Sequence, residues 1–278
     1  MRFLFSTGSL YTYGLERCFG FAAEAGFDGI ELMVDERWDT RQSAYLQKLV
    51  ARHGLSIYAV HSPFRPVPGW PGGMVEAIEQ SVTLAEKLNA TTVVHHLPIK
   101  VGLIFVTIQG RRQIVPIPGW NPAHAYHDWL SDGGYQKLQK QTSVKLCIEN
   151  MPAWRALGRR WNGFHWNTPE ALTQFTTLTL DTTHLGTWGL EPANVYARWR
   201  QRVQHVHLSN FDGHEHRLPL VGHLDLGRFL GALAADGYMG SVTMELAPQA
   251  LNAGRSDDEI RQALSANLQQ CRAWAGQD

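Results

Sequence analysis

Short apolar segments alternate with longer amphipathic segments along the chain. Runs rich in β-branched and aliphatic residues are typical of buried strands, whereas apolar residues at helical spacing are typical of helices that pack on one face. In the first third of the chain we expect strands at about 3–6, 29–32, 55–61 and 91–96, separated by helices at about 15–25, 41–53 and 75–88. Gly26 and Gly54 directly follow two of these helices and are expected to cap them.

The same alternation continues to the end of the chain. A helix is expected at about 122–141, followed by a strand that ends at Glu149. Thr168 is a good N-cap for the next helix, with Pro169 at its first position. Three further strand–helix units follow, and the final helix is expected at 257–274. Eight such units predict an α/β fold, a (β/α)8 TIM barrel that forms a single domain over residues 1–278.

One segment interrupts this alternation. Residues 97–122 form a long stretch in which we expect an irregular loop. Loops of this length in compact domains are commonly functional. The stretch contains Ile104, Phe105, Ile114, Ile117 and Trp120, so it is too apolar for a solvated tether. We therefore expect a folded lid or a flap that binds a partner.

Four apolar runs in the second half each end in a potential metal ligand: Glu149, Asp181, His207 and Glu245. They are separated by about one strand–helix repeat each, and a parallel barrel brings the ends of its strands to one rim. Three carboxylates and an imidazole at that rim would repel one another unless a cation lay among them. A mostly oxygen ligand set with one nitrogen suits Mn²⁺, Mg²⁺, Co²⁺ or Zn²⁺.

Further polar residues are predicted on the same rim. His61 ends the third strand, and His96 is expected to face the pocket because His95 points to the other side of its strand. His61 and His96 are candidates for substrate binding or packing, and alternatively for a second metal site. His184 lies three residues after Asp181. Glu31 ends the second strand, where both a structural and a chemical role are open.

The predicted rim loops are also rich in aromatic and basic residues. Indole rings could stack on a sugar, with Trp120 and Trp188 as candidates, or they could pack a lid or the interface of a homodimer. Six tryptophans fall in these loops: Trp70, Trp120, Trp154, Trp161, Trp166 and Trp188. Loop arginines could grip a phosphate or simply be solvated. His214 and His216 are ligands, substrate contacts or exposed residues, and Cys147 is expected to be a buried packing residue.

Composition narrows the function classes. The chain has 25 Lys and Arg against 25 Asp and Glu, so its formal net charge is zero, which argues against nucleic acid as the main partner without excluding it. Only three cysteines occur, a number that suits a reducing cytosol. We see no secretory signal pattern and no apolar stretch of about 18 residues. A cytoplasmic protein that does not enter a membrane is expected.

Five short motifs resemble the xylose-isomerase-like TIM-barrel superfamily, which contains sugar isomerases and epimerases together with endonuclease-IV-type apurinic endonucleases. The resemblance covers nearly the whole chain. The motifs are Gly26-Phe27-Asp28-Gly29-Ile30-Glu31-Leu32, Ile148-Glu149-Asn150, Leu180-Asp181-Thr182-Thr183-His184, His205-Val206-His207-Leu208 and Met244-Glu245.

The isomerase and epimerase branch implies one divalent cation bound by the four predicted ligands. In that branch the residues matching Glu149 and Glu245 exchange protons with the substrate, the residue matching His184 contacts it, and Arg217 is the candidate for a helpful arginine. The endonuclease branch implies three zinc ions, with His61, His96 and His184 as further ligands. That branch also carries an Asp-x-His and a Gly-Glu-Gly, where this chain has His214-Glu215-His216 and Val221-Gly222-His223.

Our hypothesis from the sequence is a metal-dependent isomerase or epimerase of a sugar or sugar phosphate. Glu149 and Glu245 would act as base and acid on either side of an enediolate. His184 and Arg217 would position substrate oxygens, and the loop at 114–120 with the tryptophans would exclude water. The alternatives are a zinc-dependent hydrolase of abasic-site DNA and, outside enzymes, a barrel that has lost catalysis and binds a carbohydrate or a partner.

Overall fold

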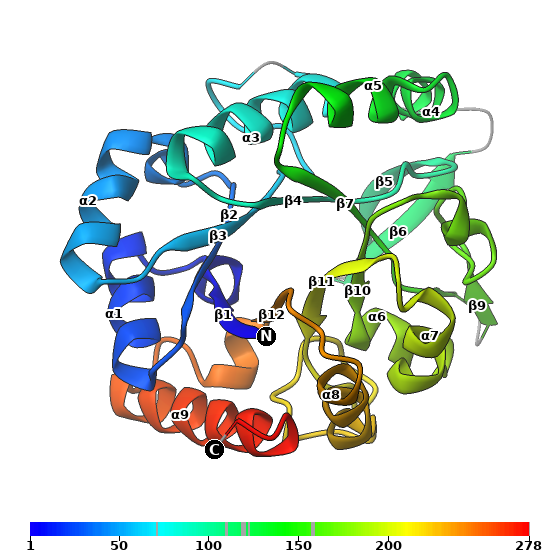
Figure 1. Cartoon of the computed structure of the whole chain (residues 1–278). Helices are drawn as coiled ribbons and strands as arrows, with labels where there is room; N and C mark the ends of the chain where they lie inside the picture. Colours follow the sequence, from blue (N-terminus) through cyan, green and yellow to red (C-terminus); the bar gives the residue numbers. More distant parts are fainter. Residues whose placement is uncertain (71, 109–110, 118–120, 122, 157–158, 278) are drawn as a thin grey trace.

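Eight parallel strands close into a barrel, and helices surround it (Figure 1). This computed structural model describes residues 1–70, 72–108, 111–117, 121, 123–156 and 159–277. Around the barrel the strands follow in the order β1 (Arg2–Ser6), β12 (Ser241–Met244), β11 (Val203–Leu208), β10 (Leu178–Asp181), β7 (Lys145–Glu149), β4 (Thr92–His95), β3 (Ile57–His61) and β2 (Gly29–Met33). The predicted (β/α)8 TIM barrel is confirmed.

Helices cover the outside of the barrel and follow most of its strands. They are α1 (Leu15–Ala25), α2 (Ser43–His53), α3 (Met74–Leu88), α4 (His124–Ser131), α5 (Gly134–Gln141), α6 (Thr182–Trp188), α7 (Pro192–Trp199), α8 (Leu226–Ala235) and α9 (Asp257–Trp274). Gly26 and Gly54 cap α1 and α2 in the left-handed conformation, as predicted. Among the described residues, none of these helices is both long and apolar enough to cross a membrane.

The strands are buried on both faces because helices cover the outside and side chains fill the inside. In β1, Phe3, Leu4 and Phe5 are all fully buried, although successive residues point to opposite faces. This explains why the strands appear in the sequence as continuous apolar runs. A ligand that directly ends such a run therefore lies at the barrel rim.

Two predicted helices differ from the structure. The helix expected at 122–141 is split into α4 and α5, because Gly133 takes a left-handed conformation (φ 81°) that ends a helix. The Thr168 hydroxyl accepts a hydrogen bond from the Ala171 amide (3.1 Å), but the segment forms only a 3-10 turn, Ala171–Gln174, since Phe175 is already extended.

The segment at 97–122 is not irregular throughout. It contains an antiparallel pair, β5 (Gly102–Ile108) and β6 (Arg111–Ile117), because its β-branched residues favour strands when they can pair locally. A second short pair, β8 (Trp154–Ala156) and β9 (Arg159–Trp161), follows β7. The lid function of the first pair stays a prediction, and Trp120 lies outside the described residues.

Gly29 at the start of β2 allows a close approach between neighbouring strands. A Cβ atom at this position would lie 2.7 Å from the Ser56 carbonyl oxygen and 2.5 Å from the Tyr58 ring. We expect Gly29→Ala to lower the free energy of unfolding by about 1–3 kcal/mol, measured by urea denaturation. Gly72→Ala is the control, because its Cβ would enter open space. Equal midpoints for the two variants would contradict this account.

Candidate metal centre

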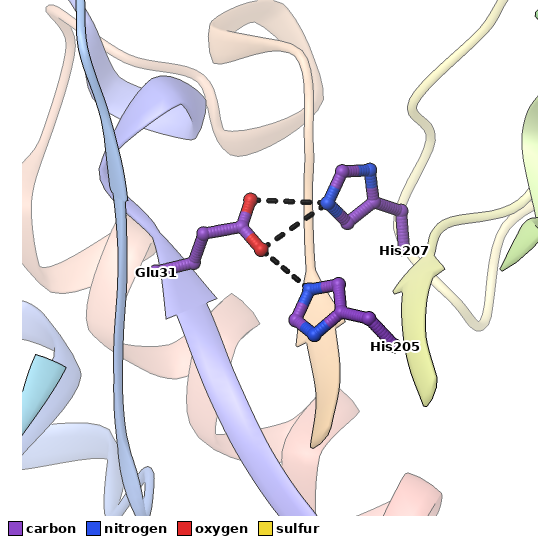
Figure 2. Close-up of side chains that lie close together, drawn as sticks. All are labelled: Glu31, His205 and His207. Carbon is purple, nitrogen blue, oxygen red and sulfur yellow. Dashed lines mark hydrogen bonds and ion pairs between the residues drawn. The ribbon is translucent and has the colours of Figure 1, made fainter. Parts of the chain in front are cut away.

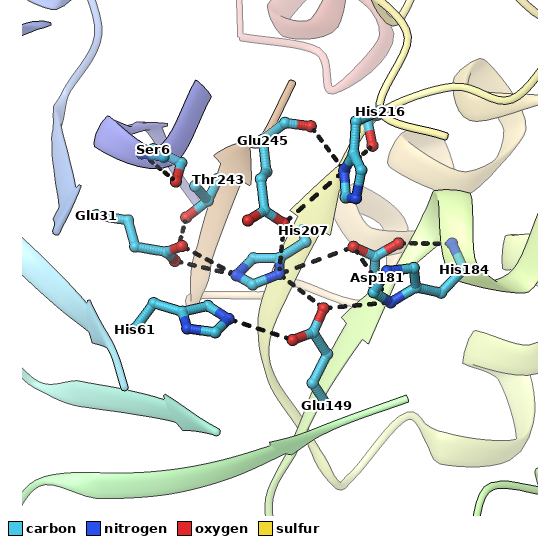
Figure 3. A network of polar contacts seen from close by, with 12 residues as sticks. Ser6, Glu31, His61, Glu149, Asp181, His184, His207, His216, Thr243 and Glu245 are labelled. Atoms are coloured by element: carbon cyan, nitrogen blue, oxygen red, sulfur yellow. Dashed lines mark hydrogen bonds and ion pairs between the residues drawn. The ribbon is translucent and has the colours of Figure 1, made fainter. Parts of the chain in front are cut away.

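The four predicted ligands meet at the carboxyl rim of the barrel. Glu149 and Asp181 end β7 and β10, His207 lies near the end of β11, and Glu245 directly follows β12. One ligand atom from each of the four lies within 4.8 Å of the other three. Figure 3 shows His207 at the centre, with the three carboxylates around one side of its ring. The juxtaposition that the sequence predicted is therefore present.

His207 Nδ1 is the point to which the carboxylates converge. It lies 3.0 Å from Glu149 Oε1, 3.1 Å from Glu245 Oε2 and 3.8 Å from Asp181 Oδ2. Asp181 and His207 are fully buried, whereas the Glu245 side chain is 13 % exposed. Glu149 and Glu245 line the pocket above this cluster, so these two carboxylates can reach a bound molecule.

The electrostatics of this cluster require a counter-charge. Burial raises the pKa of Asp181, and repulsion by Glu149 adds to it, so this pKa lies well above the usual range. For Glu149 and Glu245, burial also raises the pKa, but attraction by His207 and hydrogen bonds from it outweigh that effect. The pKa of Glu149 is held well below its usual value, and that of Glu245 is lowered to about 2. The raised pKa of Asp181 indicates that the neighbouring histidines do not fully compensate three ionised carboxylates, so a cation would stabilise this cluster.

Asp181 provides the structural test of whether a cation fits. Its Oδ1 atom accepts a hydrogen bond from the His184 amide (2.7 Å), whereas its buried Oδ2 atom has no hydrogen-bond partner. Buried polar atoms in proteins are nearly always paired. An unpaired carboxylate oxygen within reach of two further carboxylates and an imidazole suits a divalent metal ion.

Glu31 holds the far side of the His207 ring (Figure 2). His207 Nε2 lies 3.1 Å from Glu31 Oε1, and His205 Nε2 lies 2.6 Å from Glu31 Oε2. The Thr243 hydroxyl donates to the same carboxylate (3.0 Å). With its Nε2 held in this way, His207 presents Nδ1 to the carboxylate cluster, the arrangement typical of metal-binding histidines. Of the two roles left open for Glu31, the geometry supports the structural one.

The sequence reasoning missed His205. Its partner Glu31 comes from the opposite side of the barrel, and both side chains are completely buried. A signal was available in the run His205-Val206-His207, because alternate residues of a strand share a face. His205 lies two residues before His207 on β11 and therefore one layer deeper in the barrel.

His61 and His96 both contact Glu149. Their Nε2 atoms lie 3.4 and 3.2 Å from Glu149 Oε2, so these three residues form a second group of potential ligands. His95 points away, as predicted, with Nδ1 2.7 Å from the Tyr126 hydroxyl. Burial lowers the pKa of His95 to about 3, so it stays neutral.

A third group of potential ligands lies beside the first. It consists of His184, Glu215 and His216. His184 Nδ1 is held by the Asn150 carbonyl oxygen (2.8 Å), and His184 Nε2 lies 3.7 Å from Glu215 Oε2. His216 lines the pocket with His184, whereas His214 is largely exposed beside Asp212.

Four predicted substrate contacts are absent from the described lining of the pocket: Arg217, Trp188, His61 and Glu31. His61 and Glu31 are buried below it, in contact with Glu149 and His207. Arg217 Nε lies 3.0 Å from Asp212, because its loop folds back on Asn210 through two backbone hydrogen bonds. Trp188 Nε1 donates instead to the Met151 carbonyl (3.1 Å). Cys147 is fully buried, and burial raises the pKa of its thiol to about 12, as expected for a packing residue.

The pocket above the cluster has a volume of about 900 Å³. It is bounded by the metal-type ligands on one side and by the segments after β1, β2 and β3 on the other. TIM-barrel enzymes carry their active sites at this rim. The fold and the site together define a class of protein: TIM barrels with a cluster of carboxylates and histidines at the carboxyl ends of their strands.

Residues 19–268 match the family described as xylose isomerase-like TIM barrel, and the chain belongs to this family. An uncharacterised protein of Mycobacterium leprae is 26% identical over 293 residues, which cover 97% of this chain and 96% of that protein.

Two solved structures share the fold. A D-tagatose 3-epimerase-like protein is 19% identical with a TM-score of 0.71, and the match covers 99% of this chain and 98% of that one. A family 2 AP endonuclease from Brucella melitensis is 16% identical with a TM-score of 0.66, and the match covers 96% and 98%.

Proposed function

We propose that this protein is a divalent-metal-dependent isomerase or epimerase of sugars. The observation that carries the proposal is the four-ligand group of Glu149, Asp181, His207 and Glu245, in which a buried Asp181 oxygen lacks a partner. Similar folds include an epimerase-like protein, which agrees with this assignment. A divalent cation bound by these four residues would polarise a carbonyl oxygen and so acidify the neighbouring C–H bond.

The two glutamates would move the proton. Both line the pocket, and Figure 3 shows Glu245 above and Glu149 below the Nδ1 side of the His207 ring. Glu149 Oε2 lies 3.4 Å from His61 Nε2 and 3.2 Å from His96 Nε2, which would orient it as the base. A carboxylate on each side of a bound sugar would allow one to remove a proton and the other to supply one. His184, fixed through Nδ1, presents Nε2 as a contact for a substrate oxygen.

The test is proton exchange in heavy water. The protein is loaded in turn with Mn²⁺, Mg²⁺, Co²⁺ or Zn²⁺ and incubated with neutral ketoses, keto-sugar derivatives and sugar phosphates. Nuclear magnetic resonance should show deuterium replacing a hydrogen next to the carbonyl in at least one of them. The function is wrong if no combination exchanges.

Metal binding itself has a separate expected result. We expect saturating Mn²⁺ to raise the midpoint of thermal unfolding by about 5–10 °C over protein treated with EDTA. A ligand at a hundred times its Kd stabilises by about 2.7 kcal/mol, and each kcal/mol shifts the midpoint by about 2–4 °C at this size. Asp181→Asn should remove most of the difference, because it replaces the carboxylate whose buried Oδ2 atom has no hydrogen-bond partner. Equal midpoints with and without Mn²⁺ would favour a barrel that binds a carbohydrate or partner without catalysis.

A second candidate function is zinc-dependent hydrolysis of abasic-site DNA. It is favoured by the two further ligand groups around Glu149 and His184. The aspartate expected in the third group is absent from the sequence, but Glu215 supplies a carboxylate at that point. Three zinc ions per chain in elemental analysis, together with cleavage of an abasic duplex that falls steeply with salt, would establish this alternative. One metal ion per chain and no cleavage would exclude it.

A further inference from the structure

The pocket has two chemically different halves. Glu149, His184, His216 and Glu245 supply the polar half, on strands β7 to β12 and the loops that follow them. The other half comes from the end of β2 and the segments after β1, β2 and β3; six of its eleven lining residues are apolar and four are charged. Its apolar residues are Tyr11, Met33, Val34, Pro63, Phe64 and Val67. A volume of about 900 Å³ is near the upper end for pockets that hold drug-sized ligands, so it exceeds the needs of one sugar ring.

Two aromatic rings in the apolar half are available to a ligand. Phe64 is 49% exposed and Tyr11 is 53% exposed, although both line the pocket. The Phe64 ring stacks on His96 with a centroid distance of 5.3 Å and an interplanar angle of 14°. His96 in turn contacts Glu149, so the aromatic surface continues directly from the four-ligand group. Exposed aromatic side chains at this place suit stacking on a flat, apolar group.

The charged groups in this half are poorly arranged for a phosphate. Arg37 donates hydrogen bonds to the Asp35 carboxylate and to the carbonyl oxygens of Tyr13 and Thr7. Its guanidinium group is therefore already paired within the protein. Arg65 is the other arginine of the lining, and its guanidinium carbon lies over the Phe64 ring, 5.5 Å from the centroid. The lining of this half contains two carboxylates, Asp35 and Glu36, against two guanidinium groups, Arg37 and Arg65. This half therefore offers no surplus of positive charge to a phosphate dianion.

Resting on the proposed function, we propose that the substrate is an uncharged glycoside whose aglycone is an apolar, aromatic group. The sugar occupies the polar half, and the aglycone lies between Phe64 and Tyr11. In a glycoside the anomeric carbon is an acetal, so the carbonyl that acidifies a C–H bond has to be a ketone on another ring carbon. A reaction that oxidises one ring hydroxyl must therefore supply this substrate.

Ligand binding tests the aromatic subsite independently of catalysis. Calorimetry on the Mn²⁺-loaded protein compares 4-nitrophenyl and methyl D-glucopyranosides, both anomers of each, and glucose with glucose 6-phosphate. We expect the better nitrophenyl glycoside to bind about tenfold more tightly than its methyl counterpart, and the phosphate ester no more tightly than glucose. Phe64→Ala and Tyr11→Ala should each reduce the nitrophenyl advantage by about three- to tenfold. Trp38→Ala is the control, a 66% exposed aromatic outside the described lining.

The outcomes separate this inference from the proposed function. Equal affinity for nitrophenyl and methyl glycosides, an advantage that survives both substitutions, tighter binding of the phosphate ester, or binding of none of these compounds would overturn the aromatic subsite. A nitrophenyl advantage that both substitutions reduce supports it, even if no proton exchange is found. Exchange on a free ketose without an aryl preference would support the function and overturn the subsite.

Discussion

Glu149→Gln and Glu245→Gln are each expected to slow proton exchange by about a hundredfold or more, because each removes a carboxylate that we propose both to transfer a proton and to bind the metal. The amide keeps the size of the side chain but cannot accept the proton. The measurement is the rate of deuterium incorporation at saturating metal. Glu79→Gln, at an exposed position on α3, is the matched control and should keep the wild-type rate.

Circular dichroism and the unfolding midpoint should show that both variants remain folded. A variant with more than a tenth of the wild-type rate would remove that glutamate from the mechanism. If only one variant loses exchange, the glutamate replaced in that variant is the essential one, and exchange takes place on the face of the substrate next to it.

Replacing Glu31 is expected to affect both stability and metal binding. Its carboxylate is completely buried and neutralises His207 while hydrogen bonding His205 and Thr243. Glu31→Ala should lower the free energy of unfolding by about 3–5 kcal/mol, because it leaves these groups without their buried partner. Glu31→Gln should be milder in urea denaturation but should weaken Mn²⁺ binding about 10- to 100-fold, as expected for a residue that orients a ligand.

Calorimetric titration with Mn²⁺ separates this role from a purely structural one. A packing role alone predicts loss of stability with unchanged metal affinity in the folded Gln variant. Glu79→Gln again provides the surface control. Wild-type Mn²⁺ affinity in Glu31→Gln would show that His207 does not depend on Glu31 for its orientation.

The sequence predicted the barrel and the four-ligand group for a common reason. Strands buried on both faces appear as apolar runs, so a Glu, Asp or His that ends one of them stands out. Local spacing also placed His96 rather than His95 in the pocket, because side chains alternate along a strand.

Other features of the site and fold were not predicted, because they depend on contacts between segments that are far apart in the sequence or on the path of a loop. The contact of Glu31 with His205 joins strands from opposite ends of the chain. Arg217 turns to Asp212 because of the path of its own loop, which motif spacing does not report. The β5–β6 pair lies where the sequence predicted a loop. The pair was missed because its two strands pair with each other, without the following helix by which the barrel strands were recognised.

Barrel closure has a consequence for when metal can be captured. Glu245 directly follows β12, the strand that pairs with β1 and joins the two ends of the barrel. A nascent chain still lacking its last forty or so residues would hold the other three ligands but not this one. If the proposed cation binds here, its fourth ligand would join the other three only when β12 pairs with β1, so the ion would stabilise a closed barrel rather than guide earlier steps of its folding.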